Sequence, residues 1–97
     1  MKPRVVIRPE AAADIRAAQR WYRSISQELA DGFLTELRRS IDSAVERPQM
    51  FPVVYRTFRR VLLHRFPYGL FFDPGEERII VVAVLHHARN PGVIRNR

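Results

Sequence analysis

Apolar side chains recur along the first half of the chain at the spacing of amphipathic helices. Between residues 10 and 25 they lie three or four positions apart, which predicts a helix with one buried face. The side chains on this face are Ala11, Ile15, Ala18, Tyr22 and Ile25. Trp21 lies on the flank of the same helix, so the pattern leaves it at the border of the core.

A second helix is predicted from residue 26 to about Arg47. Ser26 is a suitable N-cap, and Pro48 ends the helix because it disfavours the helical conformation for the residue before it. Its apolar face consists of Ala30, Phe33, Leu34, Leu37, Ile41, Ala44 and Val45. Because so few residues join the two helices, an antiparallel helix hairpin packed on a sheet is expected.

The remaining segments have the pattern of strands. Residues 4–8, "RVVIR", predict a first strand, and residues 55–66, 68–73 and 78–87 predict three more, separated by Pro67 and by the turn "PGEE". The last strand is apolar throughout, so it should be central and covered on both faces. The sequence therefore predicts an α+β fold over residues 1–97 as one domain: an N-terminal strand, a helix hairpin, and a three-stranded antiparallel meander with the helices on one face.

Composition narrows the possible functions. Of 17 Lys and Arg all but Lys2 are arginine, and the formal net charge is +7, which favours nucleic acid or an acidic protein as partner. The chain has no cysteine, so disulfide scaffolds and thiolate metal sites are excluded. No apolar run approaches the roughly 20 residues of a membrane helix. A cytoplasmic protein without a cofactor and without membrane association is expected.

Two histidines and an arginine follow the last predicted strand. His86 and His87 are adjacent, so their side chains should point to opposite faces, and the inward one is expected to be a buried structural histidine. For the same reason a zinc site built from His64, His86 and His87 is not expected. Arg89 comes just after the strand, where it should be exposed at the rim of the sheet.

Other charged and aromatic residues are candidates for partner contacts. Arg59 and Arg60 should alternate between the two faces of a strand, one of them paired with a helix carboxylate such as Glu36 or Asp42 and the other free for a partner. Trp21 is a candidate anchor for a partner segment. The tail carries two more cations that are compatible with a frayed basic end, Arg95 and Arg97.

The order of these elements and six short segments resemble the RelE/ParE superfamily of type II toxin-antitoxin toxins, and its ParE-like branch more than its RelE-like one. The segments are "RWY" (20–22), "GFLTEL" (32–37), "ERPQMFP" (46–52), "RR" (59–60), "RFPYGLFF" (65–72) and "VAVLHHARNP" (82–91). The resemblance implies a toxin neutralised by a cognate antitoxin, which should be acidic and ParD-like and should contact Trp21, Arg60 and Arg65.

The resemblance implies two alternative targets. ParE-like members bind DNA gyrase and leave it poisoned on cleaved DNA, whereas RelE-like members cut mRNA on the ribosome. For the nuclease, the candidate residues are Arg89, His86, His87, His64 and Arg65. A third alternative is an inactive or nucleic-acid-binding domain that keeps the fold.

Two positions depart from the nuclease pattern. Gly69 follows Tyr68 where RelE-like nucleases have an arginine, and Arg95 stands where they have a catalytic tyrosine. The resemblance therefore favours a gyrase-binding toxin over an endoribonuclease. The residues expected to contact that target are Arg59, Arg60, Arg89 and Arg95.

Overall fold

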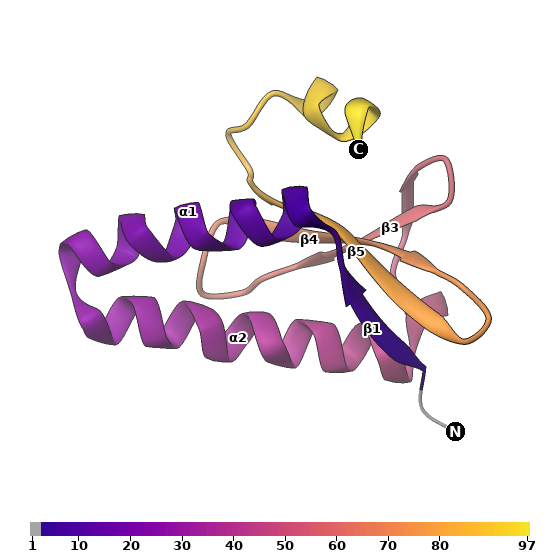
Figure 1. The fold of residues 1–97 in the computed structure, drawn as a ribbon, viewed down its shortest axis with the longest axis horizontal. Coiled ribbons are helices and arrows are strands. Elements are labelled where there is room, and N and C mark those ends of the chain that lie inside the picture. Colours follow the sequence, from indigo (N-terminus) through magenta and orange to yellow (C-terminus); the bar gives the residue numbers. More distant parts are fainter. Residues whose placement is uncertain (1–2) are drawn as a thin grey trace.

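Two helices cover one face of a five-stranded sheet in the computed structural model, which describes residues 3–97 (Figure 1). In chain order the elements are β1 (Arg4–Ile7), α1 (Pro9–Ile25), α2 (Gln27–Glu46), the 3-10 helix η1 (Pro48–Met50), β2 (Val53–Tyr55), β3 (Phe58–Leu62), β4 (Tyr68–Pro74), β5 (Arg78–His86) and the 3-10 helix η2 (Pro91–Asn96). The strand order is β1-β5-β4-β3-β2, with β1 parallel to β5 and the other neighbours antiparallel. The predicted α+β architecture is confirmed.

The helix hairpin is closed by a single residue. The backbone N–H of Ser26 donates to the carbonyl of Tyr22 at the end of α1, while its hydroxyl accepts from the N–H of Leu29 at 3.1 Å. The predicted N-cap is therefore confirmed, and the two helices run antiparallel side by side (Figure 1). Ile25 was expected on the buried face, but it is 58% exposed because α1 ends beyond the edge of the core.

Strand β5 is buried on both faces, as predicted. On the helix side, Val81 and Val84 join the core with Phe33 of α2. On the far side, Val82 and Leu85 form a second cluster with residues that include Ile94 of η2. The sheet therefore has an apolar layer on each face, one covered by helices and the other partly covered by the C-terminal segment.

The predicted strand 55–66 is wrong in its extent. Arg56 has a φ of 51°, so the chain turns there and pairs β2 with β3 as a hairpin. Strand β3 ends at Leu62, and residues 63–67 form a connecting loop. As a result β2 occupies the edge of the sheet, and β3, which was expected nearer the edge, is its inner neighbour.

The C-terminal segment is fixed by Asp14 of α1. Arg97 makes a bidentate ion pair with this carboxylate, at 2.6 and 3.0 Å, and its Nη1 also donates to the carbonyl of Val82 at 3.2 Å. Asp14 accepts in addition the backbone N–H of Val84 at 3.0 Å. The hydrogen bond that Arg97 donates to Asp14 raises the pKa of Arg97. The expectation of a frayed tail is therefore wrong for Arg97, which is anchored to strand β5.

Four aromatic rings fill the space between the helix hairpin and the loop before β4. Tyr22 lies 4.9 Å from the ring centroid of Phe66 and 5.5 Å from that of Phe33, and the Tyr68 ring lies 5.2 Å from Phe33. The Tyr22–Phe66 and Phe33–Tyr68 pairs have the edge-on geometry that aromatic quadrupoles favour, whereas the Tyr22–Phe33 pair is tilted. Burial raises the pKa of Tyr68, and burial followed by the nearby Tyr68 raises that of Tyr22.

We predict that Asp14→Ala destabilises the chain by about 3 kcal/mol, because it leaves a guanidinium and the Val84 N–H without their acceptor in a site where both charged side chains are nearly buried. Urea unfolding measures this loss. Asp42→Ala on the exposed side of α2 is the matched control and should change stability by less than about 0.5 kcal/mol. Equal effects of the two substitutions would contradict the anchoring role of Asp14.

We predict a loss of stability in alkali that depends on Tyr22, which is buried, and Tyr68, which is partly buried. Their pKa values are raised above the ordinary 10.0 in the folded chain, so the unfolded chain loses these protons first. The stabilisation is complete below that value and is lost as the pH rises through the folded pKa values. The variant with Tyr22→Phe and Tyr68→Phe should show a flatter dependence of unfolding free energy on pH between about pH 9 and pH 11. Parallel curves for the two proteins would refute this prediction.

Candidate functional site

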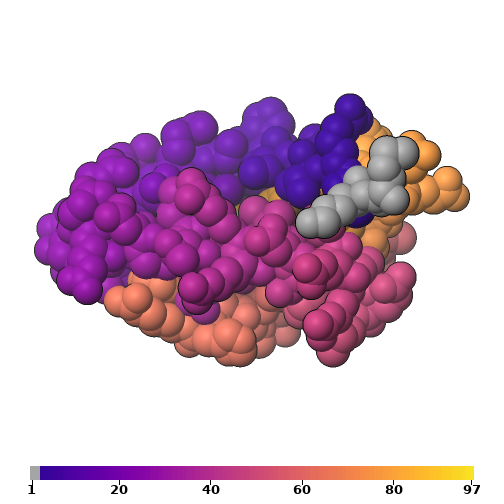
Figure 2. All heavy atoms as spheres, turned by 90° about the horizontal axis from the view of Figure 1, so that it is seen from below, coloured from indigo at the N-terminus to yellow at the C-terminus, as the bar shows by residue number. Residues whose placement is uncertain are grey.

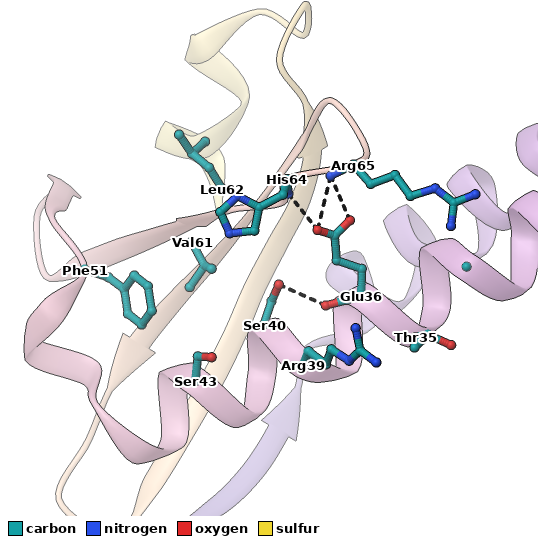
Figure 3. A pocket seen from close by; sticks show the side chains of 11 residues that line it. Thr35, Glu36, Arg39, Ser40, Ser43, Phe51, Val61, Leu62, His64 and Arg65 are labelled. Atoms are coloured by element: carbon teal, nitrogen blue, oxygen red, sulfur yellow. Dashed lines mark hydrogen bonds between the residues drawn. The ribbon is translucent and has the colours of Figure 1, made fainter.

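A groove of about 610 Å³ separates α2 from β3 and the loop after it (Figure 3). We call it the helix groove. Its lining combines exposed cations with apolar side chains: Gly32, Thr35, Glu36, Arg39, Ser40, Ser43, Phe51, Val61, Leu62, His64 and Arg65. Leu62 is 48% exposed at its edge. The helix groove therefore presents apolar surface next to exposed cations.

Glu36 holds the loop that forms one wall of the helix groove. Its carboxylate accepts the backbone N–H groups of His64 at 2.6 Å and of Arg65 at 3.1 Å (Figure 3). The loop consequently lies along α2, as the space-filling view also shows (Figure 2). These bonds occupy Glu36 with backbone groups, so its predicted pairing with Arg59 or Arg60 is wrong.

Gly32 makes room for Arg65 across α2. A Cβ atom at Gly32 would lie 2.8 Å from Nη1 of Arg65, and the guanidinium carbon lies 5.2 Å from the ring centroid of Phe66. Glycine within a helix costs about 1 kcal/mol relative to alanine. The position of Arg65 is thus obtained at the expense of helix stability.

A second, smaller groove of about 190 Å³ lies on the far face of the sheet. We call it the sheet groove. It is lined by Val54, Arg60, Gly69, Phe71, Leu85, His86, His87, Arg89, Asn90, Pro91 and Ile94. Among the described residues, its lining includes no carboxylate and no tyrosine. The sheet groove is therefore apolar, and the basic side chains on its rim have no carboxylate beside them in the described part of the groove.

Arg59 and Arg60 lie on opposite faces of β3, as predicted. Nη1 of Arg59 donates to the carbonyl of Phe51 at 2.7 Å, on the helix side. Arg60 lines the sheet groove, where its stem crosses Gly69 of the neighbouring strand. The predicted ion pair of one of them with Glu36 or Asp42 does not form, because the Arg59 guanidinium uses a backbone carbonyl and Arg60 points away from the helices.

Both histidines at the end of β5 are exposed, so the prediction of one buried structural histidine is wrong. The ring of His86 lies edge-on to Tyr68 with 5.2 Å between centroids, and its Nδ1 accepts the N–H of Ala88 at 3.0 Å. The strand extends past the core before it reaches them, which leaves His87 and Arg89 exposed beside the sheet groove.

The sequence pattern of the family described as "ParE toxin of type II toxin-antitoxin system, parDE" matches residues 5–91. The chain belongs to the ParE family. A solved structure described as "Chromosomal ParDE TA system from P. aeruginosa" is similar in fold, with a TM-score of 0.76 and 18% sequence identity over 88% of this chain and 96% of that one. No curated protein sequence matches the chain.

In this ParE toxin the residues proposed for RNA cleavage are divided between the two grooves. His64 and Arg65 line the helix groove, whereas His86, His87 and Arg89 line the sheet groove. Of the residues expected to contact the target, Arg60 and Arg89 share the sheet groove, but Arg59 lies on the other face. Arg95 is exposed on η2.

The residues expected to bind the antitoxin are also dispersed. Trp21 is 62% exposed near the end of α1, Arg65 lies in the helix groove, and Arg60 lies in the sheet groove. No described helix of this ParE toxin is long and apolar enough to cross a membrane. Within residues 3–97, no group of three or more histidine and acidic side chains is placed to hold a metal ion.

Sequence reasoning missed the residues that position the grooves. In the sequence, Asp14 and Glu36 look like ordinary exposed carboxylates on a helix. In the structure they accept hydrogen bonds from backbone N–H groups that lie 70 and 28 residues further along the chain. Gly32 and Gly69 carried a usable signal, because glycine inside a helix or strand frequently marks a close approach. Their partners, Arg65 and Arg60, could be identified only from the folded chain.

We predict that Gly32→Ala stabilises the toxin by roughly 0.5 kcal/mol, as the helix gains about 1 kcal/mol while Arg65 loses an exposed contact with Phe66 that is worth about half as much. Displacement of Arg65 is easy because the clash involves the far end of a flexible side chain. Urea unfolding measures the gain. A destabilised variant would show instead that Arg65 supports the fold from its present position.

Proposed function

We propose that this ParE toxin inhibits growth in the cytoplasm by binding DNA gyrase and leaving it trapped on cleaved DNA, and that an acidic, ParD-like antitoxin neutralises it. Membership of the ParE family supports the toxin assignment. The observation that favours gyrase over mRNA is the composition of the sheet groove, which contains cations but, among the described residues, no tyrosine or carboxylate.

Cleavage of RNA by its 2′-hydroxyl requires a general base, a general acid and cations for the phosphate. Arg60 and Arg89 would serve as cations. Tyr68 packs toward the helices with Phe33, and Arg95 is exposed where the nuclease pattern has a tyrosine. Proton transfer would depend on His86 and His87 alone. The groove is therefore better suited to binding than to cleavage.

The helix groove is the better of the two for the antitoxin. It is wide, it has exposed apolar surface at Leu62, and it carries Arg39 and Arg65. The negative charge of Glu36 is outweighed in this groove by the two arginines, and its carboxylate is held against two backbone N–H groups. An antitoxin segment with alternating apolar and acidic residues would fill this groove, and Trp21 would anchor its continuation along the helix hairpin.

One observation supports the nuclease alternative. RelE-like nucleases have an arginine at the position of Gly69. In this chain the side chain of Arg60 crosses Gly69 and brings a guanidinium to the same groove. One of the two departures from the nuclease pattern is therefore compensated in space. The alternative must be tested directly beside the gyrase proposal.

We predict that purified, antitoxin-free toxin produces gyrase-dependent DNA cleavage complexes and leaves mRNA intact on translating ribosomes. The first is measured as linear plasmid after protein denaturation, and the second by primer extension on a defined message. Induced expression in bacteria should cause filamentation and a DNA-damage response. Codon-phased mRNA cuts with no gyrase-dependent cleavage would reject the proposal, and an absence of growth inhibition would favour the inactive alternative.

Arg89→Ala should weaken gyrase poisoning about tenfold, a factor that corresponds to about 1.4 kcal/mol of binding free energy. Its melting temperature should stay unchanged, because Arg89 is exposed. Arg38→Ala, an equal loss of charge on the outer side of α2, is the control and should retain full potency. Equal losses in the two variants would mean that overall charge, rather than the sheet groove, binds the target.

A further inference from the structure

Arg60 carries an unexplained buried donor. Within residues 3–97, its Nε is the buried side-chain nitrogen or oxygen that has no hydrogen-bond partner. Buried polar groups are nearly always paired, because an unpaired one costs roughly 1–3 kcal/mol. For a cationic guanidinium the cost is higher. Arg60 also lines the sheet groove, so an acceptor bound there lies beside the guanidinium that carries this unpaired donor.

The position of Arg60 is set by the strand beside it. Arg60 pairs with Phe71 in the β3–β4 register, and its stem lies over Gly69. A Cβ atom at Gly69 would approach Cδ of Arg60 to 3.3 Å and Cγ to 3.4 Å, closer than ordinary contacts. A Cβ at position 69 would force the stem to move by a few tenths of an ångström. Gly69 therefore keeps the guanidinium in the sheet groove.

The surroundings of Arg60 define the acceptor. Arg89 and His87 lie on the rim of the same groove, and Phe71, Leu85 and Ile94 form its apolar lining. The described lining includes no acidic side chain, so the positive charge has no internal counterion. Guanidinium groups match the oxygens of phosphate, and a partly desolvated site strengthens the attraction. A volume of about 190 Å³ suits one phosphate group with part of its attached sugar.

We infer that the sheet groove binds a phosphodiester group of single-stranded nucleic acid, with Arg60 as the inner donor and Arg89 and His87 as outer contacts. The inference goes beyond the proposed function, since it concerns the isolated toxin and holds whether or not gyrase is the target. Binding here involves no bond cleavage. The net charge of +7 supplies long-range attraction for the polyanion, while the groove supplies the specific contact.

The experiment follows the Nε–H resonance of Arg60 in ¹H–¹⁵N spectra during titration with inorganic phosphate, then with oligothymidylate and oligouridylate. Saturable shifts of this resonance with all three probes are expected. The two oligonucleotides should bind more tightly than free phosphate, and their relative affinities distinguish DNA from RNA as the source of the phosphate.

Matched variants separate the groove from the overall charge. Arg60→Gln should weaken oligonucleotide binding about tenfold and reduce the slope of log affinity against log salt by about 0.7, the share of one phosphate contact. Arg38→Gln removes an equal charge on the exposed side of α2 and should leave the Arg60 resonance shift intact. Thermal melting of each variant verifies that it is folded.

Gly69→Ala provides a test that keeps every charge. It should shift the Arg60 stem by a few tenths of an ångström and weaken binding by less than Arg60→Gln does, whereas Gly32→Ala, the same substitution in the helix groove, should have no effect on binding. Should Gly69→Ala fail to fold, Arg60→Gln with its control still decides the question.

Three results would overturn the inference. The first is an Arg60 resonance that does not respond to phosphate. The second is equal weakening by Arg60→Gln and Arg38→Gln, which would mean diffuse electrostatic binding. The third is a response of Arg60 to acetate or an acidic peptide at lower concentrations than to phosphate, which would assign the groove to a protein carboxylate.

Discussion

The structure depends on covering strand β5, which has nine residues and is much longer than β1, with four. Beyond Val81 the edge of β5 that faces β1 has no partner strand, although the strand is buried there. Asp14 and Arg97 complete this edge, one accepting from Val84 and the other donating to Val82. Their ion pair satisfies backbone groups that a buried strand cannot leave unpaired. It also brings η2 against the far face, where Ile94 becomes a wall of the sheet groove. The contacts of Asp14 and Arg97 that satisfy the edge of β5 therefore also help to form the sheet groove.

Both grooves rely on a glycine that admits an arginine from a neighbouring segment. Gly32 in α2 accommodates the Arg65 guanidinium, and Gly69 in β4 accommodates the stem of Arg60. Each glycine weakens its own element, by about 1 kcal/mol in the helix. A chain selected for stability alone would favour alanine at position 32. The same device therefore positions one cation in each groove, at a cost to the stability of the element that carries the glycine.

Local patterns were sufficient for the helices and for the identity of the buried strand. The period of apolar residues located both helix faces, and the uninterrupted apolar run identified β5, because both signals arise from burial along one element. The orientation of His86 could not be predicted from the sequence. A β-bulge where Phe71 and Phe72 pair with β5 changes which side chains of β5 face the helices after Val81. The roles of Asp14, Glu36 and Arg60 depend on contacts between distant segments, for which the sequence contains no periodic signal.

The charge distribution of the fold favours binding of an acidic partner. The chain has 17 Lys and Arg against 10 Asp and Glu, and within residues 3–97 the ion pair of Arg97 with Asp14 is the single salt bridge. Glu36, which could have neutralised a nearby arginine, is committed to the backbone of the 63–67 loop. Asp14 and Glu36 are thus held by contacts within the chain, while most of the described arginines form no ion pair. Because like charges in close proximity raise the free energy of the isolated chain, any acidic partner gains affinity simply by relieving this repulsion. The proposed binding of an acidic antitoxin and the inferred binding of a nucleic-acid phosphate would then be two consequences of one imbalance, and they would compete for the same cations wherever their binding surfaces overlap.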